Sequence, residues 1–281
     1  MEDLGEARIA EMDAAGIDMQ VISHGPPGAQ GVRSGAGADW TRRCNDILCA
    51  AVALRPDRLA GLASVATDDP QAGAEELARA VEVLGLKGAV LHTLAAGPSL
   101  DDPRHLPIFA RAAELGVPIY LHPADPGPQM MKGHYAGFAR THPMFVRAGW
   151  GFMVEAGTQA MRLVLSGLFD RCPDLQMILG HFGETIPFQL ARIDEALARD
   201  TPMKDFREVF TRHFHVTTSG FFSDTALACV IAEIGVERVM FAVDWPYAPN
   251  VAGADWLRAA PISAAERQMI GADNARRLLR L

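Results

Sequence analysis

Short, β-branched apolar runs alternate with longer amphipathic stretches along the whole chain. Parallel strands that are covered by helices give this pattern. The runs predict seven strands, at Asp18–His24, Leu59–Val65, Gly88–His92, Val117–His122, Gln176–His181, Phe214–Ser219 and Val239–Val243. Helices are predicted at Leu4–Ala15, Asp39–Leu54, Pro70–Leu84, Pro103–Leu115, Glu155–Phe169, Thr185–Ala198, Ser223–Ile234 and Ser263–Leu281. A chain of 281 residues suits one α/β domain, so we expect a single domain over residues 1–281.

The number and order of the predicted elements favour an incomplete TIM-like (β/α) barrel. The common closed parallel barrel has eight strands and begins on a strand. This chain offers seven and begins on a helix, so the first strand is expected to be absent. A doubly wound open sheet is the alternative, but no Gly-rich phosphate-binding turn follows an early strand.

The charge balance narrows the classes of partner. With 26 Lys and Arg against 34 Asp and Glu, the formal net charge is -8, which disfavours nucleic acid and anionic membranes. The sequence has no apolar run long enough for a membrane helix, and its acidic start has no signal core, so we expect a cytoplasmic protein. The four cysteines lack CxxC spacing and are expected to be buried thiols.

Polar residues end most of the predicted strands. Catalytic groups of parallel barrels project from these carboxyl ends. The residues concerned are His24, His92, His122, His181, Thr218 or Ser219, and Asp244. A single histidine at a strand end is more often a hydrogen-bonded rim residue, and this is the interpretation without a chemical role for His24 and His92. The rigid strand before His122 favours a metal ligand, as does the Trp-Pro that follows Asp244, where a helix cap is the alternative.

Two further features point to chemistry at this end. His181 is followed three residues later by Glu184, a spacing that suits a general acid–base or electrophilic pair, although it is weak on its own. The irregular segment Pro123–Ala148 follows the fourth predicted strand, and long loops in compact domains are usually functional.

Several strings resemble one branch of the amidohydrolase superfamily. They are LHP at 121–123, SGLFDRCPDLQMILGHFGE at 166–184, HVTTSG at 215–220, VDWPY at 243–247, DNARRLLRL at 273–281 and the opening RIAEMDAAGIDMQVIS. They are similar to the aminocarboxymuconate-semialdehyde decarboxylase branch, and in particular to the γ-resorcylate and 2,3-dihydroxybenzoate decarboxylases. The resemblance covers essentially the whole chain.

The resemblance implies specific roles. His122 and Asp244 would bind a divalent metal, Zn or Mn, while His181 and Glu184 would form the catalytic pair. Trp150 and Tyr247 match positions that line the family's aromatic pocket, with plain packing as the alternative. Dimers are usual in the family, so a homo-oligomer, a dimer or tetramer, is expected.

One departure from the family concerns the metal site. Family members carry Glu-x-His or His-x-His on the first barrel strand, and nothing in residues 1–22 resembles it. This agrees with the independent strand count. We expect a metal that is bound weakly, because two protein ligands leave most of its coordination shell to water.

The activity implied is non-oxidative decarboxylation of a small hydroxylated aromatic acid. Asp244 would donate the proton to the ring carbon, and His181 with Glu184 would polarise the phenolic oxygen. A metal-dependent hydrolase of a lactone, ester or amide is the first alternative, in which Asp244 is the base for an attacking water. A truncated, catalytically impaired member is the second.

Overall fold

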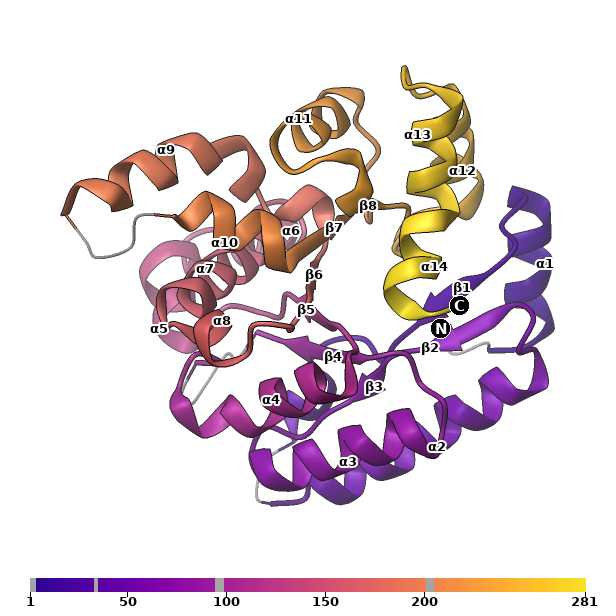
Figure 1. The fold of residues 1–281 in the computed structure, drawn as a ribbon, viewed down its shortest axis with the longest axis horizontal. Helices are drawn as coiled ribbons and strands as arrows, with labels where there is room; N and C mark the ends of the chain where they lie inside the picture. The colour runs from indigo at the N-terminus through magenta and orange to yellow at the C-terminus, as the bar shows by residue number, and fades with distance from the viewer. Residues whose placement is uncertain (1–3, 33–34, 94–98, 201–204) are drawn as a thin grey trace.

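In a computed structural model that describes residues 4–32, 35–93, 99–200 and 205–281, every strand pairing is parallel and the strands lie at the seven predicted positions (Figure 1). The strands are β1 (Gln20–Ile22), β2 (Leu59–Gly61), β3 (Ala63–Ser64), β4 (Ala89–His92), β5 (Ile119–His122), β6 (Met177–Leu179), β7 (Phe214–Thr217) and β8 (Val239–Met240). The second predicted strand is divided into β2 and β3 at Leu62. β1 pairs with β2, and β3 to β8 pair in sequence order.

The ring of strands is open between β8 and β1. No pairing joins these two strands within the described ranges. β8 is short because the backbone N–H of Phe241 leaves the ladder and donates to the carbonyl of Ile270, 2.8 Å away. We refer to this opening as the seam, and it is where the sequence predicted a missing strand.

Helices surround the strands, and most of them cover the outside. They are α1 (Glu6–Ala15), α2 (Gly37–Leu54), α3 (Pro70–Glu82), α4 (Leu106–Leu115), α7 (Gly151–Leu165), α8 (Leu168–Arg171), α9 (Ile186–Asp200), α10 (Phe206–His213), α11 (Asp224–Ile234), α12 (Asn250–Ala259), α13 (Ala264–Gln268) and α14 (Asn274–Leu279). The sequence did not predict α10 or α12. The predicted final helix is interrupted by a π-helical turn at Met269–Asp273.

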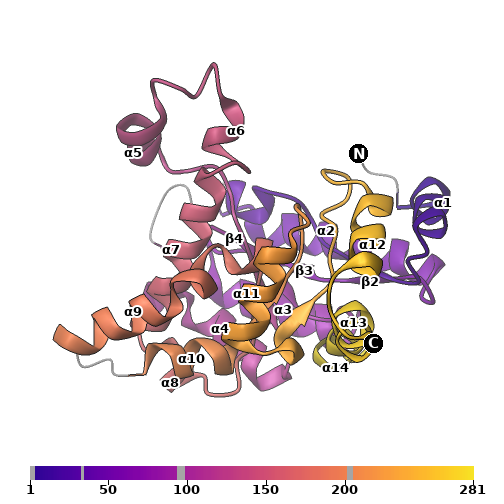
Figure 2. The ribbon, with the colours of Figure 1, turned by 90° about the horizontal axis from the view of Figure 1, so that it is seen from above.

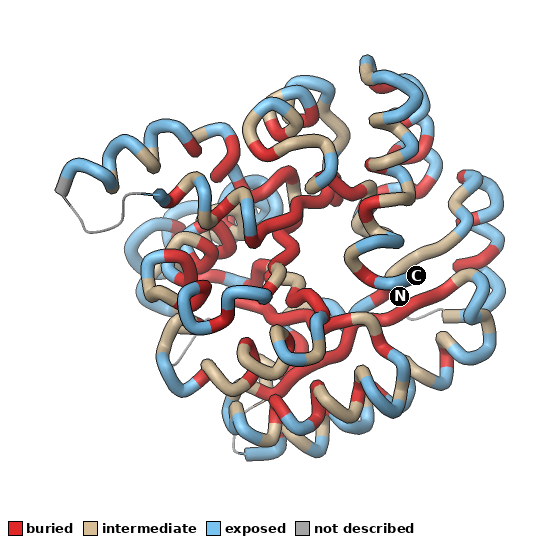
Figure 3. The backbone as a smooth tube through the Cα atoms, viewed as in Figure 1, coloured by how far each residue is buried: buried red, intermediate tan, exposed pale blue. Residues whose placement is uncertain are grey.

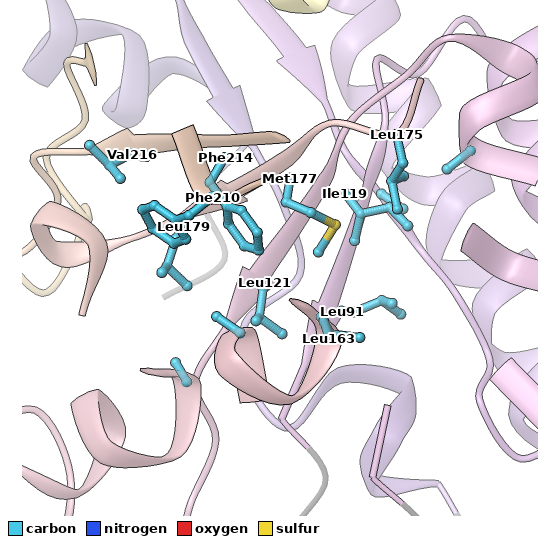
Figure 4. Packing of buried hydrophobic residues seen from close by; sticks show 14 of the residues in the cluster. Leu91, Ile119, Leu121, Leu163, Leu175, Met177, Leu179, Phe210, Phe214 and Val216 are labelled. Atoms are coloured by element: carbon cyan, nitrogen blue, oxygen red, sulfur yellow. The ribbon is translucent and has the colours of Figure 1, made fainter. Parts of the chain in front are cut away.

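The main core lies between the strands and the helices that cover them. Side chains such as Leu91, Leu121, Met177 and Phe214 pack there against helical residues (Figure 4). Phe210 of α10 stacks on Phe214, with ring centroids 4.6 Å apart. Figure 3 shows the strands as a buried band beneath helices whose outer surfaces are exposed. Burial of these apolar faces is the main force that holds the strands in order.

A second, smaller cluster fills the amino-terminal end of the ring. Because side chains alternate along a strand, Ile178 faces inward between Met177 and Leu179, which face the helices. Ile178 packs with Met240 and with Leu279 of α14. The C-terminal helix therefore closes the end of the barrel opposite to the predicted site.

The segment after β5 forms an excursion that projects from the body of the molecule (Figure 2). It contains α5 (Pro128–Met130), a π-helical turn at Met131–Tyr135 and α6 (Pro143–Val146). This segment, predicted to be irregular, thus carries short helices of its own. Among the described helices, none combines the length and the hydropathy needed to cross a bilayer.

Polar contacts attach α1 across the seam. The guanidinium of Arg8 lies 4.0 Å from the ring centroid of Trp245, and the indole N–H of Trp245 donates to Glu11. Arg258 of α12 donates to the carbonyl of Ala15 at the end of α1. These contacts connect the first helix to the segment that follows β8.

Candidate active site

Three histidines form a row at the carboxyl ends of neighbouring strands. His92 ends β4 and His122 ends β5, and they are register partners whose ring centroids lie 5.2 Å apart. The ring of His181, just after β6, lies 6.1 Å from that of His122. The sequence predicted that His122 and His181 converge with Asp244 at this end of the barrel, whereas it favoured a hydrogen-bonded rim residue for His92.

His122 is arranged as a neutral nitrogen donor. Its Nδ1 lies 2.7 Å from the carbonyl oxygen of Pro123, so Nδ1 carries the proton and Nε2 keeps its lone pair. Burial and the neighbouring His181 lower the pKa of His122 to about 4, against the opposing effect of that hydrogen bond. A neutral imidazole with a free Nε2 suits a metal ligand.

His181 and Glu184 form a close ion pair. The distance from Nδ1 to Oε1 is 2.6 Å, and Glu184 is buried. Burial lowers the pKa of His181, but the Glu184 carboxylate outweighs burial and the net shift is upward. The pair therefore favours imidazolium, with Nε2 as a hydrogen-bond donor.

The backbone around this pair is strained. His181, Phe182, Glu184 and Thr185 all have positive φ, between 51° and 68°. Residues other than glycine rarely adopt this left-handed region, because it costs conformational energy. These dihedral angles turn the chain back within a few residues, so that the Glu184 carboxylate reaches the imidazole of His181.

Asp244 faces the same space as His181. It follows Val243 with a φ of 73°, and burial and the Glu184 carboxylate raise the pKa of Asp244, against the opposing effect of His181. A Cβ added to Gly220 would lie 3.4 Å from His181 Nε2 and 3.5 Å from Asp244 Oδ2. Gly220, with a φ of 81°, therefore lets the backbone pass close to both side chains, and a Cβ there would also lie 3.0 Å from His181 Cδ2.

A cluster of hydroxyl groups lies beneath these residues. The Tyr120 hydroxyl is 3.1 Å from Thr217 Oγ1 and 3.4 Å from Ser219 Oγ. The backbone N–H of His181 donates to Ser219 Oγ at 3.2 Å. Burial raises the pKa of Tyr120 to about 12, so this hydroxyl keeps its proton.

The sequence left open whether Thr218 or Ser219 belongs to the site, and the structure distinguishes the two residues. Thr218 Oγ1 donates to the backbone carbonyl of Ala242 at 2.9 Å, so it joins the segments that follow β7 and β8. Ser219 contacts His181 instead. Alternation along β7 and beyond would have placed Thr217 and Ser219 on one face and Thr218 on the other.

His92 and Gln30 extend the row of histidines. His92 is 1% exposed, and its Nδ1 lies 3.1 Å from Oε1 of Gln30. Its Nε2 is buried without a hydrogen-bond partner among the described residues. Sequence reasoning missed Gln30, because nothing local links it to a strand 62 residues away. His24 packs its ring on Trp40, at 4.8 Å between centroids.

Trp150 and Tyr247 lie at the surface. Trp150 precedes α7 and is 49% exposed, and Tyr247 is 68% exposed. No ring contact of either residue with the histidine row is found in the described part of the chain. Their assignment to an aromatic pocket stays a prediction.

The described residues supply only part of a metal-binding site. His122 Nε2 and the Asp244 carboxylate have suitable chemistry, but the described residues contain no group of three His, Cys, Asp or Glu side chains placed to hold a metal. Structural and catalytic metal sites usually take three or more protein ligands. The donor set thus fits a divalent ion only in part.

Comparisons with known proteins cover nearly the whole chain. The model of the amidohydrolase family matches residues 2–281. A γ-resorcylate decarboxylase from Rhodococcus jostii is 39% identical, over 99% of this chain and 88% of its own. One from a Rhizobium species is 37% identical over the same shares. The crystal structure of a dihydroxybenzoic acid decarboxylase from a Polaromonas species, with bound manganese and the inhibitor 2-nitroresorcinol, superposes with a TM-score of 0.93 at 34% identity. That match covers 99% of this chain and 86% of the other.

Proposed function

The chain belongs to the amidohydrolase family, and we propose that it is a non-oxidative decarboxylase that removes CO2 from a small hydroxylated aromatic acid. The observation that carries the proposal is the closeness of His181 and Asp244, whose Nε2 and Oδ2 both lie within 3.5 Å of the point where a Cβ on Gly220 would stand. Replacing a carboxylate on an arene by hydrogen needs a proton donor at the ring carbon and a positive group at the phenolic oxygen. Asp244 and His181 supply those two groups.

In the proposed reaction Asp244 transfers its proton to the ring carbon that bears the carboxylate. The imidazolium of His181, held by Glu184, donates a hydrogen bond to the phenolic oxygen while the ring loses aromaticity. The bond to the carboxylate then breaks, its electron pair restores the aromatic ring, and CO2 leaves. Asp244 recovers a proton from solvent, so that one proton and one carboxylate yield one arene C–H and CO2.

We assign His122 Nε2 and Asp244 as protein donors to a divalent ion, with zinc and manganese as candidates. Such an ion would neutralise the substrate carboxylate and an adjacent hydroxyl oxygen. Manganese is supported by the Polaromonas neighbour. Because the described residues provide only part of a coordination shell, we expect the ion to exchange readily with the buffer.

The test is release of CO2 from 2,6- and 2,3-dihydroxybenzoate by purified protein, with and without added Mn²⁺ or Zn²⁺. Decarboxylation is expected, and it is expected to rise with added metal and fall after chelation. Turnover of lactones or aryl esters without CO2 release would contradict the proposal and favour the hydrolase alternative, for which Asp244 would serve as base. No turnover of either class at any metal concentration would indicate an impaired member.

We further propose that Trp150 and Tyr247 bind the aromatic substrate and that the protein is a cytoplasmic homo-oligomer. The apolar residues exposed on the excursion, among them Phe138 and Met144, support association between copies. Trp150→Leu is expected to raise KM more than it lowers kcat. Light scattering after size exclusion measures the oligomeric state, and a monomer would contradict that part of the proposal.

A further inference from the structure

A pocket lies at the opposite end of the barrel from the histidine row. It has a volume of about 400 Å³, and its lining includes His215, Arg238, Arg277 and Arg280. Arg238 immediately precedes β8, so it lies at the amino-terminal end of that strand. Arg277 belongs to α14, and Arg280 follows that helix. The pocket is thus separate from the site that would bind the aromatic acid.

Positive charge predominates in this pocket. Three guanidinium groups line it, against one carboxylate, that of Glu237. None of the three arginines forms an ion pair with an Asp or Glu among the residues the structure describes. The Glu237 carboxylate instead turns back toward Gly235, where an added Cβ would lie 2.4 Å from its Oε1.

The arginines are partly held in place by neutral acceptors. Arg277 Nη2 donates to the carbonyl of Glu237 at 2.7 Å and to Asn274 Oδ1 at 2.9 Å. Arg238 Nη1 donates to Gln176 Oε1 at 3.3 Å. These contacts position the guanidinium groups without neutralising them. Their remaining N–H donors are available to a ligand.

His215 adds a buried donor that lacks an acceptor. It is 6% exposed, and Arg238 Nη1 lies 3.3 Å from its Nε2. Arginine can only donate, so Nε2 accepts and the neutral ring carries its proton on Nδ1. Within the described residues Nδ1 has no hydrogen-bond partner. A buried donor without an acceptor costs free energy, and a bound anion would remove that cost.

We propose that this pocket binds a phosphoryl-type oxyanion carried by a small phosphorylated metabolite. Guanidinium groups bind phosphate oxygens through paired N–H donors, and several of them together select a multiply charged anion over a single carboxylate. The volume is in the range of small-molecule pockets and exceeds what one phosphate would fill. His215 also lines the pocket and adds a neutral imidazole rather than a further carboxylate.

The pocket and the active site share strand β7. His215 and Thr217 are two residues apart on this strand, so their side chains lie on the same face of the sheet. Thr217 contacts the Tyr120 hydroxyl at the other end. The two sites are therefore close along the barrel interior but open at opposite ends, and the anion is not expected to compete with the aromatic substrate.

Titration calorimetry of the purified full chain with pyrophosphate tests the proposal without reference to catalysis. Saturable binding with one site per chain is expected, with weaker binding of inorganic phosphate because it leaves part of the pocket unfilled. Arg280→Gln is expected to weaken pyrophosphate at least tenfold. Arg276→Gln is the matched control, because Arg276 lies on the helix that Arg280 follows, is exposed and is absent from the pocket lining. It should bind pyrophosphate as the unaltered protein does.

Three outcomes would overturn the proposal. They are the absence of saturable binding, an equal loss of affinity in Arg276→Gln and Arg280→Gln, and displacement of pyrophosphate by 2,6-dihydroxybenzoate. The second would indicate diffuse charge attraction, and the third would place the anion in the active site.

Thermal unfolding of each variant shows whether it is folded. Arg280 is suited to this test because no hydrogen bond of its guanidinium is found among the described residues. Failure of this proposal leaves the decarboxylase proposal unaffected, since that one is tested by CO2 release.

Discussion

The strands β3 to β8 and the region around β1 are built in different ways. β3 to β8 form one continuous six-stranded sheet over a large apolar core. In the part of the chain that the structure describes, β1 pairs with β2 alone, and beside it Ile9, Met12, Ile22 and Leu59 form a small separate cluster. Helix α1 supplies Ile9 and Met12 to this cluster and also makes polar contacts with Trp245 and α12. Apolar packing fixes the larger region, which carries His122 and His181, while the region at the seam depends on a few specific side chains.

The largest expected effect is a loss of kcat on substitution of Asp244, which lies beside the histidine row. Asp244→Asn removes the proposed proton donor and should lower kcat for CO2 release by roughly 10²- to 10⁴-fold, the range for general acid catalysis. Asp255→Asn on α12 is the control, since Asp255 is exposed and, among the described residues, bonds to Arg258 alone. Steady-state kinetics in excess Mn²⁺ measures both. A small effect of Asp244→Asn would remove the acid from the mechanism.

Core truncations compare the stability of the two regions directly. Phe210→Ala deletes a fully buried ring of the main core and should lower the free energy of unfolding by about 3–5 kcal/mol. Met12→Ala, in the small cluster, should cost about 2 kcal/mol, the low end of its range, because a loosely bounded site relaxes more easily. Urea unfolding measures both. An equal or larger cost for Met12→Ala would show that the seam is as tightly packed as the sheet.

The polar attachment of α1 is tested by Arg8→Met. This change removes the guanidinium over Trp245 and its 2.9 Å hydrogen bond to Gln20 Oε1 while it keeps the aliphatic stem. Loss of about 1–2 kcal/mol is expected, since buried cation–π contacts reach that range. Arg43→Met on the exposed surface of α2 should change stability little. If both variants unfold alike, α1 is held by its apolar face alone.

The smallest expected effect concerns acid stability in the larger region. Hydrogen bonds from Arg162 and Ser99 outweigh burial and lower the pKa of Asp101 to about 2. A carboxyl group whose pKa is lowered by folding stabilises the folded state at any pH above about 4, the ordinary pKa of Asp. This contribution is lost as the pH falls toward 2. Because Arg162 is half exposed, the gain is at most about 1 kcal/mol. Asp101→Asn should therefore destabilise the protein at pH 7 and have almost no effect near pH 2. A difference that persists there would contradict this account.

The elements that the sequence predicted are those with a local signal. β-branched runs fixed the strand positions, and the residue that ends each run identified His122, His181 and Asp244 as neighbours. Helix α10 was missed because only Phe206, Val209 and Phe210 of its eight residues are apolar. Helix α12 was missed because Pro246 and Pro249 precede it and Gly253 lies within it. The assignment of metal, catalytic and pocket roles to these residues stays a prediction.

Contacts between distant parts of the chain could not be read from the sequence. Gln30 bonds to His92, and Arg8 covers Trp245, only because the barrel brings these segments together. The backbone strain at His181–Thr185 also has no sequence signal, since ordinary side-chain residues occupy positions where glycine is usual. Gly220 is the exception, because a glycine after a run of hydroxyl residues indicates a close approach.

The open seam bears on how well the protein resists aggregation. A strand edge that lacks a neighbour is a template on which other chains can add, and long, flat edges are the ones that form fibrils. Here the two edges at the seam are β1 with three residues and β8 with two. A foreign strand could form only a few backbone hydrogen bonds with either. Their shortness protects the protein, and an engineer who extends β8 for greater stability would also lengthen a template for insoluble assemblies.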